Sequence, residues 1–274
     1  MLPPPVWRAV ARRIGLLASL AARERRRVLE MNAGFLAPAL PPRARVRLAR
    51  QTFINFFEAA SDLFRVPSLQ PGEIQEMIAA EGLEHLQAAR SLGRGVIVVT
   101  PHLGPYELGA AYVAGLGLPV HGMVEEIDPE TNAALASYRA ATGMGVISRS
   151  SGLRQMYRLL KEGQIVLLVA DRVVGEGAEG IEVPWGGGRR AVPSGPAAFA
   201  LATGAPIVSG YIVRRPAGAR TRYLLHLDAP IVATGKSRDE LTRDVAARMA
   251  DAVCQHPDQW YVFQPDWQPR DASA

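Results

Sequence analysis

Hydrophobic positions divide the chain into two parts with different periodicity. Up to about residue 90, apolar residues recur every three or four positions, a spacing that predicts amphipathic helices. We expect these helices near residues 6–30, 45–65, 73–80 and 83–92. An apolar stripe in the second helix is typical of core packing, although a groove for an acyl chain would need the same residues. This stripe consists of Phe53, Phe56, Phe57, Ala60 and Phe64.

After Gly95, short apolar runs alternate with helical segments. The runs predict strands near residues 96–100, 119–124, 145–148, 165–170, 206–213 and 222–228. The segments between them predict helices near residues 107–115, 129–142, 152–162, 196–203 and 238–254. This alternation favours an α/β fold with a mixed, largely parallel central sheet flanked by helices. We therefore expect an N-terminal helical region over residues 1–90, continuous with an α/β domain over residues 91–274.

The segment from Gly95 to Glu107 combines a predicted buried strand with two chemically active side chains. Residues 96–99 are four consecutive β-branched residues, which favour a strand. The strand should stop at Pro101, because proline cannot donate to a sheet ladder. His102 then follows at the carboxyl end of the strand, where α/β proteins bind ligands. Glu107 opens the next helical pattern, so the segment presents a base and a carboxylate. Turn and helix capping would explain the same two residues equally well.

Two other charged pairs lie at positions suited to ligand binding. Asp171 and Arg172 directly follow an apolar strand and could bind substrate phosphates or pair with each other. Arg189 and Arg190 lie in a glycine-rich segment that we interpret as a flexible turn before a helix. Arginine at such a turn suits an anionic headgroup or a carrier phosphate.

The net charge of +5 is concentrated at the N-terminus. Residues 1–50 hold eleven arginines and two glutamates, a balance of +9 that leaves −4 for the remainder. Apolar residues at helical spacing share one face of the first helix, with arginines opposite, as in helices that lie on anionic membranes. The apolar face contains Trp7, Val10, Ile14 and Leu17, and the opposite face contains Arg8 and Arg12. A solvated arginine-rich helix is the alternative.

Nucleic acid is a less favoured partner, because the chain has no aromatic-rich RNA-binding motif and no helix-turn-helix pattern. The apolar stretch from Ile14 to Ala22 lacks a cleavage pattern, so we expect no secretory signal. The uncharged run from Ala191 to Val213 contains three prolines and is a poor membrane span. These features predict a peripheral or monotopic protein on the cytoplasmic face of a membrane.

Several other classes of site are disfavoured by the residues present. The single Cys254 excludes an intrachain disulfide, and the five histidines have no zinc-ligand spacing, so we predict no metal. Gly175, Gly177 and Gly180 match GxGxxG, but neighbouring glutamates would repel a pyrophosphate. No GxSxG nucleophile elbow occurs.

Six segments in fixed order resemble the lipid A acyltransferase and phosphatidylinositol mannoside acyltransferase branch of the bacterial lysophospholipid-acyltransferase-like superfamily. The segments are HLGPYE, YRAATGMGVI, LLVADR, IEV, RRAVPSGPAAFALATGAPIV and HPDQWYVFQPDW. The resemblance covers residues 45–268, and it implies a glycerolipid-acyltransferase-like fold and a place at the bacterial inner membrane. The segments around Tyr138, Asp171 and Trp260 are closer to the mannoside enzymes, whereas Glu107 in the HX4E pattern is more usual in the lipid A enzymes.

The resemblance implies that an acyl thioester, on coenzyme A or acyl carrier protein, is attacked by a sugar hydroxyl of a membrane glycolipid, with no further cofactor. It makes His102 the general base. Glu107 is the motif carboxylate, and Glu182 matches a position that the mannoside enzymes use beside their histidine, so both are candidate partners. Arg139 and Arg172 are candidates for binding the donor phosphate or the headgroup.

Alternatives remain at this point. A lipid A acyltransferase would differ only in acceptor, a phosphatidate-forming acyltransferase usually has aspartate in the histidine motif, and a non-catalytic lipid-binding module would keep the fold without turnover.

Overall fold

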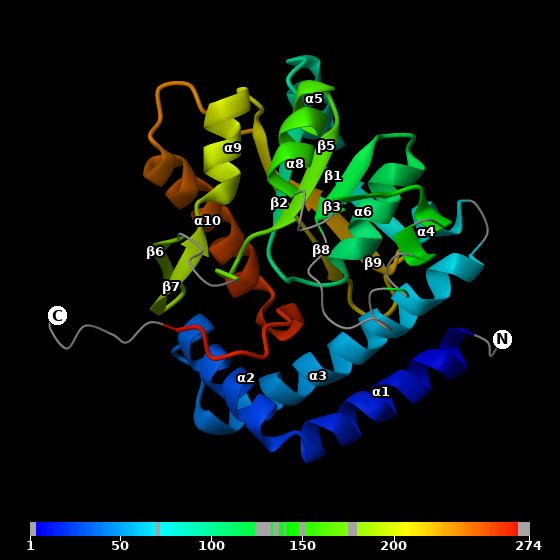
Figure 1. The fold of residues 1–274 in the computed structure, drawn as a ribbon. Coiled ribbons are helices and arrows are strands. Elements are labelled where there is room, and N and C mark those ends of the chain that lie inside the picture. The colour runs from blue at the N-terminus through cyan, green and yellow to red at the C-terminus, as the bar shows by residue number, and fades with distance from the viewer. Residues whose placement is uncertain are drawn as a thin grey trace, which may run out of the picture.

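The computed structural model describes residues 4–69, 72–123, 133, 137–139, 141–147, 152–174 and 180–267. Its N-terminal part consists of helices α1 (Pro4–Ala21), α2 (Arg23–Leu36) and α3 (Pro42–Arg65). The single helix predicted over residues 6–30 is therefore two helices, which meet at Ala22. Figure 1 shows α1 at the outer edge of the molecule, with α3 between it and the α/β part.

A seven-stranded sheet forms the centre, in the order β1-β9-β8-β2-β5-β3-β4. Its strands are β1 (Ile78–Glu81), β2 (Val96–Thr100), β3 (Val120–Met123), β4 (Gly145–Ile147), β5 (Ile165–Val169), β8 (Ile207–Arg214) and β9 (Tyr223–Leu227). Neighbours are parallel except β8 and β9, which are antiparallel. This confirms the mixed, largely parallel sheet.

The start of the α/β part differs from the prediction. The helix expected over residues 73–80 ends early as α4 (Glu73–Met77), and the chain continues as β1 in parallel with β9. The sheet therefore begins before residue 90. The helix predicted over residues 129–142 lies mostly outside the described residues.

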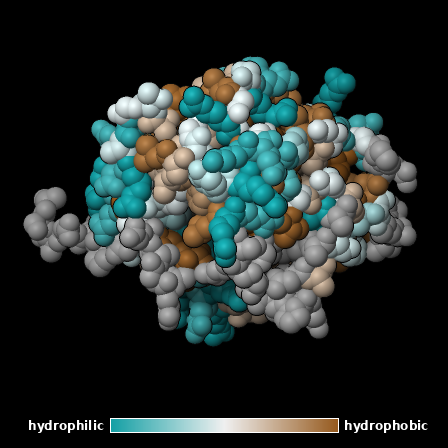
Figure 2. Space-filling model, turned by 45° about the horizontal axis from the view of Figure 1, so that its top comes forward, coloured by the Kyte–Doolittle hydropathy of each residue, from teal (hydrophilic) through white to brown (hydrophobic). Residues whose placement is uncertain are grey.

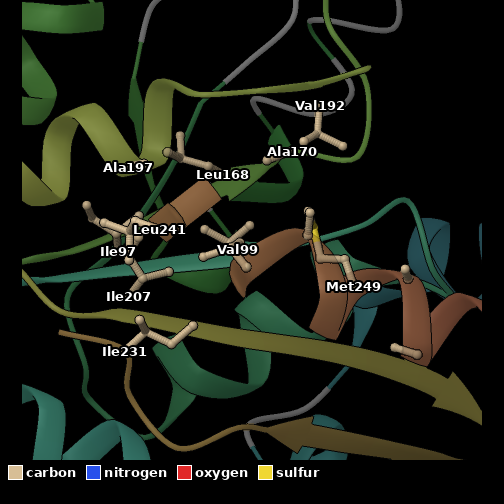
Figure 3. Close-up of a cluster of buried hydrophobic side chains, with 14 of the residues drawn as sticks. Ile97, Val99, Leu168, Ala170, Val192, Ala197, Ile207, Ile231, Leu241 and Met249 are labelled. Atoms are coloured by element: carbon tan, nitrogen blue, oxygen red, sulfur yellow. The ribbon is translucent and has the colours of Figure 1, made fainter. Parts of the chain in front are cut away.

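Helices cover both faces of the sheet (Figure 1). One face carries α5 (Leu83–Ser91) and α6 (Tyr106–Gly115), and the other carries α8 (Gly152–Lys161), α9 (Gly195–Thr203) and α10 (Arg238–Gln255). Side chains of β2 alternate between two cores: Val96 belongs to the α5/α6 side, whereas Ile97 and Val99 belong to the α8/α9/α10 side. Figure 3 shows Ile97 and Val99 among the buried side chains of the second core. Both faces are thus buried, as the continuous apolar run predicts.

Residues 180–193 form an antiparallel hairpin of β6 (Gly180–Trp185) and β7 (Gly188–Pro193). The flexible turn predicted around Arg189 and Arg190 is therefore wrong: both arginines lie on β7. Gly186, at the tip, has φ +57°, and a Cβ there would lie 2.7 Å from the Phe35 carbonyl oxygen. The close approach of α2 requires glycine at this position. Of the GxGxxG glycines, Gly175 and Gly177 lie outside the described residues.

Helix α1 packs on α3 through its small residues. A Cβ on Gly15 would lie 2.8 Å from the Ile54 Cα, so the two backbones are in close contact. Ala11 and Ser19 are buried on the same side, whereas Leu17 is 65% exposed. Val10, Ile14 and Leu17 of the predicted apolar face are consequently exposed, whereas the Trp7 indole N–H donates to the Ser61 carbonyl oxygen of α3 at 3.1 Å. No helix among the described residues is long and apolar enough to cross a membrane.

Candidate active site

His102 lies just beyond the carboxyl end of β2, at the centre of the sheet. Gly104, two residues later, has φ +61°, and a Cβ there would lie 1.8 Å from the Ile212 carbonyl oxygen. The turn after His102 therefore requires glycine. The C-terminal segment holds this turn from the other side, because the backbone N–H of Tyr261 donates to the His102 carbonyl oxygen at 2.8 Å and that of Gly104 donates to the Gln259 carbonyl oxygen at 2.8 Å.

Asp171 is the carboxylate that binds His102. It follows β5, the parallel neighbour of β2, so the ends of the two strands meet at the same edge of the sheet. The His102 Nδ1 and Asp171 Oδ1 atoms are 2.5 Å apart, and the His102 backbone N–H donates to Asp171 Oδ2 at 3.0 Å. The Asp171 side chain is fully buried, whereas that of His102 is 19% exposed.

The pKa of Asp171 lies below its ordinary value despite its burial. Desolvation alone would raise this pKa, but the charge of His102 and the hydrogen bonds from His102 and Trp260 outweigh it. Asp171 is therefore ionised at neutral pH and accepts the Nδ1 proton of His102. Nε2 then carries the lone pair, and no described residue forms a hydrogen bond with it.

Trp260 and Arg190 lie behind Asp171. The Trp260 indole N–H donates to Asp171 Oδ2 at 2.7 Å, and Arg190 Nη2 donates to the Asp171 backbone carbonyl oxygen at 3.4 Å. Arg190 is fully buried, and its guanidinium carbon lies 4.8 Å from the ring centroid of Trp260. Its pKa is lowered by burial, against the opposing influence of Asp171 and Asp266. Arg190 therefore holds the backbone of Asp171 through a hydrogen bond from the buried side.

The two carboxylates predicted to partner His102 have other partners. Glu107 is buried and forms an ion pair with Arg139, so it stabilises the start of α6. Glu182 is 53% exposed and pairs with Arg189 across the hairpin at 3.4 Å. The structure thus places neither of them on the His102 ring. Glu107 was a candidate because of its spacing from His102, and Glu182 because of the family resemblance; neither signal shows which strand ends are neighbours.

The predicted binding residues also divide into groups. Arg139 is buried against Glu107 and Arg190 is buried against tryptophan, so neither side chain is exposed in this structure, and their role in binding a headgroup stays a prediction. Asp171 binds His102 rather than substrate. Arg172 is half-buried beside the site, close enough that its charge acts on Tyr106 and Arg190. Arg189 is exposed on the hairpin.

An apolar cavity of about 40 Å³ begins beside the histidine. Tyr106 lines it, and its ring is edge-on to the His102 ring, with the centroids 5.8 Å apart. Thr100 lies at the same end of the cavity, whereas Val120 and Ile165 lie where β3 and β5 begin. The cavity therefore follows the strands for about four residue steps, or about 13 Å. Burial raises the pKa of Tyr106, so its hydroxyl keeps its proton.

This arrangement can perform general base catalysis beside an apolar binding site. A buried carboxylate fixes the tautomer of a histidine whose other ring nitrogen is open, which is the geometry that activates a hydroxyl. In the described part of the chain, no three His, Cys, Asp or Glu side chains come together as a metal site.

Two contributors to the site were not predicted. Trp260 lies in the QWYVFQPDW segment, which contributes to the family resemblance but predicts no role for the indole. Tyr106 lies inside HLGPYE, and its proximity to the histidine could have suggested a wall of the site. The signal for Asp171 was its place directly after a strand, which was assigned to substrate binding instead.

Comparisons with known proteins agree on one chemical class. The family model for bacterial lipid A biosynthesis acyltransferases matches residues 1–269. The phosphatidylinositol mannoside acyltransferase of Mycolicibacterium smegmatis is 25% identical over 235 residues, which cover 84% of this chain and 74% of that protein. The protein of the same name from Mycobacterium tuberculosis H37Rv is 26% identical over 213 residues, which cover 75% of this chain and 66% of that protein.

Among solved structures, the 1-acyl-sn-glycerophosphate acyltransferase of Thermotoga maritima is similar, with a TM-score of 0.42 and 15% identity. The similarity covers 88% of this chain and 96% of that one.

Proposed function

The chain belongs to the bacterial lipid A biosynthesis acyltransferase family, and on that premise we propose that it moves a fatty acyl group from an acyl thioester to a sugar hydroxyl of a membrane glycolipid. Acyl transfer itself follows from the family and from the activity named for the relatives. The observation that supports the finer proposal is the His102–Asp171 pair beside the apolar cavity. A base and a site for an alkyl chain are the two things that this reaction needs.

In the proposed reaction, His102 Nε2 takes the proton of the sugar hydroxyl while the oxygen attacks the thioester carbonyl carbon. Asp171 stabilises the imidazolium through the Nδ1 proton. The tetrahedral intermediate then expels the thiolate, which receives the proton from the imidazolium, so the ester and a free thiol are formed. A positioned base of this kind typically contributes about 10²- to 10⁴-fold in rate.

The cavity under α6 marks the proposed entry of the donor's acyl chain, and it must widen to hold a long alkyl chain, because its volume in this structure is only about 40 Å³. Its lining is almost entirely apolar, and Tyr106 and Thr100 place its end beside the catalytic pair. An alkyl chain bound there brings the carbonyl carbon to the histidine. Coenzyme A and acyl carrier protein present the same thioester, and either can be the donor in this proposal.

The acceptor proposed first is a mannosylated phosphatidylinositol, because the relatives in both mycobacterial organisms are named for it. A glucosamine-based lipid A precursor is the second candidate, because the matching family model carries that description. Both acceptors present a sugar hydroxyl, so the same site serves either.

The reaction is tested by incubating the purified full chain with labelled palmitoyl-coenzyme A or palmitoyl carrier protein and either glycolipid. We expect an acylated glycolipid, identified by mass spectrometry, with the native protein and none above background with His102→Ala. Product from only one glycolipid assigns the acceptor. Absence of transfer with every donor and acceptor pair would overturn the proposed activity and support the lipid-binding alternative.

We also propose that α1 attaches the protein to the cytoplasmic face of the membrane. Its exposed apolar residues include Ile14 and Leu17, whereas Arg8 and Arg12 turn inward to Asp62 and Glu58 of α3. Both arginines are therefore paired with α3, although the Arg12 side chain is still 52% exposed. Attachment would depend first on the apolar face and second on the exposed arginines near the start of α2.

One other face of the molecule can be compared with the exposed face of α1. Figure 2 shows that the described residues on one other face mix hydrophilic residues with small separate hydrophobic patches. The segment of residues 257–263 lies between α3 and the sheet in Figure 1, so the catalytic end of the sheet is on the side of the N-terminal helices. A glycolipid held in the membrane would reach His102 from that side.

Sedimentation with vesicles of phosphatidylcholine and phosphatidylglycerol tests the attachment. Leu17→Glu should reduce the bound fraction, whereas Leu201→Glu, on the exposed face of α9, should leave it unchanged. Equal binding by the two variants would contradict the role of α1.

A further inference from the structure

We propose that Trp260 is a positioning residue that sets the basicity of His102 through Asp171. The kinetic part of this proposal rests on the proposed function, whereas its electrostatic part does not. The indole contacts neither ring nitrogen of His102 in the hydrogen bonds of the described residues, so it acts on the base only through the carboxylate.

The geometry assigns three donors to the Asp171 carboxylate. Oδ1 accepts from His102 Nδ1 at 2.5 Å, and Oδ2 accepts from the His102 backbone at 3.0 Å and from Trp260 Nε1 at 2.7 Å. Asp171 and Trp260 are both shielded from solvent. In this dry setting, water cannot replace a lost donor, and each hydrogen bond is strong.

The N–H of Trp260 withdraws negative charge from the carboxylate that would otherwise act on His102. A carboxylate with one donor fewer is a stronger acceptor for the Nδ1 proton and stabilises the imidazolium more. Loss of the indole N–H should therefore raise the pKa of His102. The base would then be protonated, and inactive, over a wider range of pH.

Other charges around the pair are held in place by partners of their own. Glu107 and Arg139 pair with each other beside Tyr106, whose ring faces His102. Arg190 lies under Asp171 and pairs with Asp266 at 3.4 Å, and Arg172 follows Asp171 in the chain. Of these groups, Arg190 also faces the Trp260 ring, with its guanidinium carbon 4.8 Å from the ring centroid, so the comparison needs a control that alters a ring on Arg190 and keeps the donor to Asp171.

The chain contains a matched control in Trp185. Its indole is equally buried, its ring centroid lies 6.2 Å from that of Trp260, and both rings flank Arg190. The Trp185 N–H has no hydrogen-bond partner among the described residues. Trp185→Phe therefore removes a similar ring from the same core without removing a donor from Asp171.

The decisive measurement is the titration of the His102 ring by NMR in the full chain, which requires no turnover. Relative to Trp185→Phe, Trp260→Phe should raise the pKa of His102 by roughly half to one unit, as expected for one lost hydrogen bond to a charged group. The acidic limb of kcat/KM against pH should move upward by the same amount, and kcat/KM on that limb should fall by about three- to tenfold, the fold-change that corresponds to half to one pKa unit. Equal pKa values in the two variants would overturn the proposal.

If Trp260→Phe does not fold, replacement of Trp260 by β-(3-benzothienyl)alanine keeps the ring and exchanges only the N–H for sulfur. An unchanged His102 titration in that protein would overturn the proposal in the same way. Absence of turnover in the native protein would instead contradict the proposed function, and the titration would still decide the role of Trp260.

Discussion

Asp171 and Asp62 are both aspartates with fully buried side chains, but their partners differ in kind. Asp171 binds a histidine and an indole N–H. Asp62, on α3, binds the guanidinium of Arg222 and the hydroxyl of Tyr223, and Arg8 of α1 lies 3.7 Å away. One site lies at the open end of the sheet, and the other lies between the N-terminal helices and β9.

The difference shows how partners decide what a buried carboxylate does. A guanidinium keeps its charge over the whole pH range in which proteins are usually folded, so the ion pairs around Asp62 serve to hold α1 and α3 on the core. A histidine changes its charge near neutral pH, so the pair with Asp171 can carry a proton through a reaction.

The largest effect should come from removing the charge of Asp171. Asp171→Asn keeps the shape but no longer stabilises the imidazolium or the correct tautomer, so kcat should fall by about 10³- to 10⁴-fold. Initial rates of acyl transfer, corrected for the folded fraction, measure this. Asp62→Asn should leave the corrected rate near that of the native protein, and equal losses in the two variants would remove the distinction between the sites.

The free energy of unfolding should fall more in Asp62→Asn than in Asp171→Asn, the reverse of the order for the rate. Asp62→Asn leaves Arg222 and Arg8 without their buried anion, and breaking a buried ion pair in this way typically costs about 3–5 kcal/mol. Urea unfolding followed by circular dichroism measures the free energy of unfolding. A loss smaller than that of Asp171→Asn would show that the arginine cluster contributes little to the fold.

The pH dependence of stability should reflect the lowered pKa of Asp171. A carboxylate whose folded pKa lies below its unfolded value stabilises the protein above the unfolded value, and this contribution is lost as pH falls through the folded one. The native protein should therefore exceed Asp171→Asn in unfolding free energy by about 1–3 kcal/mol at pH 5 to 8. The difference should shrink only below the ordinary value of 3.8. Urea unfolding across that range tests this, and a difference that already shrinks near pH 6 would contradict it.

The smallest effect should come from Glu182, which is exposed and pairs only with Arg189. Glu182→Gln should change the free energy of unfolding by less than about 1 kcal/mol and leave initial rates nearly unchanged. Glu107→Gln should cost more, because it leaves Arg139 buried without its partner. A larger loss of rate from Glu182→Gln than from Asp171→Asn would instead identify Glu182 as the carboxylate that assists His102.

Most of the sheet could be predicted because its strands are long apolar runs bounded by turn residues, as in residues 96–100 and 165–169. Strand β1 could not, because its four residues follow a helical turn and become a strand only by pairing with β9. The β6–β7 hairpin was missed for a similar reason: glycine and arginine at its tip indicated a loop, and the pairing of Glu182 with Ala191 is seen only in the folded chain.

The sequence by itself determined the class of fold, the position of His102 after a strand and the family resemblance, because each depends on local pattern or on the order of segments. Only the tertiary structure decided which carboxylate binds His102 and which residue donates to that carboxylate. Asp171 is 69 residues from His102 and Trp260 is 89 residues from Asp171, so their contacts exist only because parallel strands end at a common edge that the C-terminal segment crosses. Spacing along a chain carries no information about which strands are neighbours, so it could not identify Asp171 as the partner in place of Glu107 or Glu182.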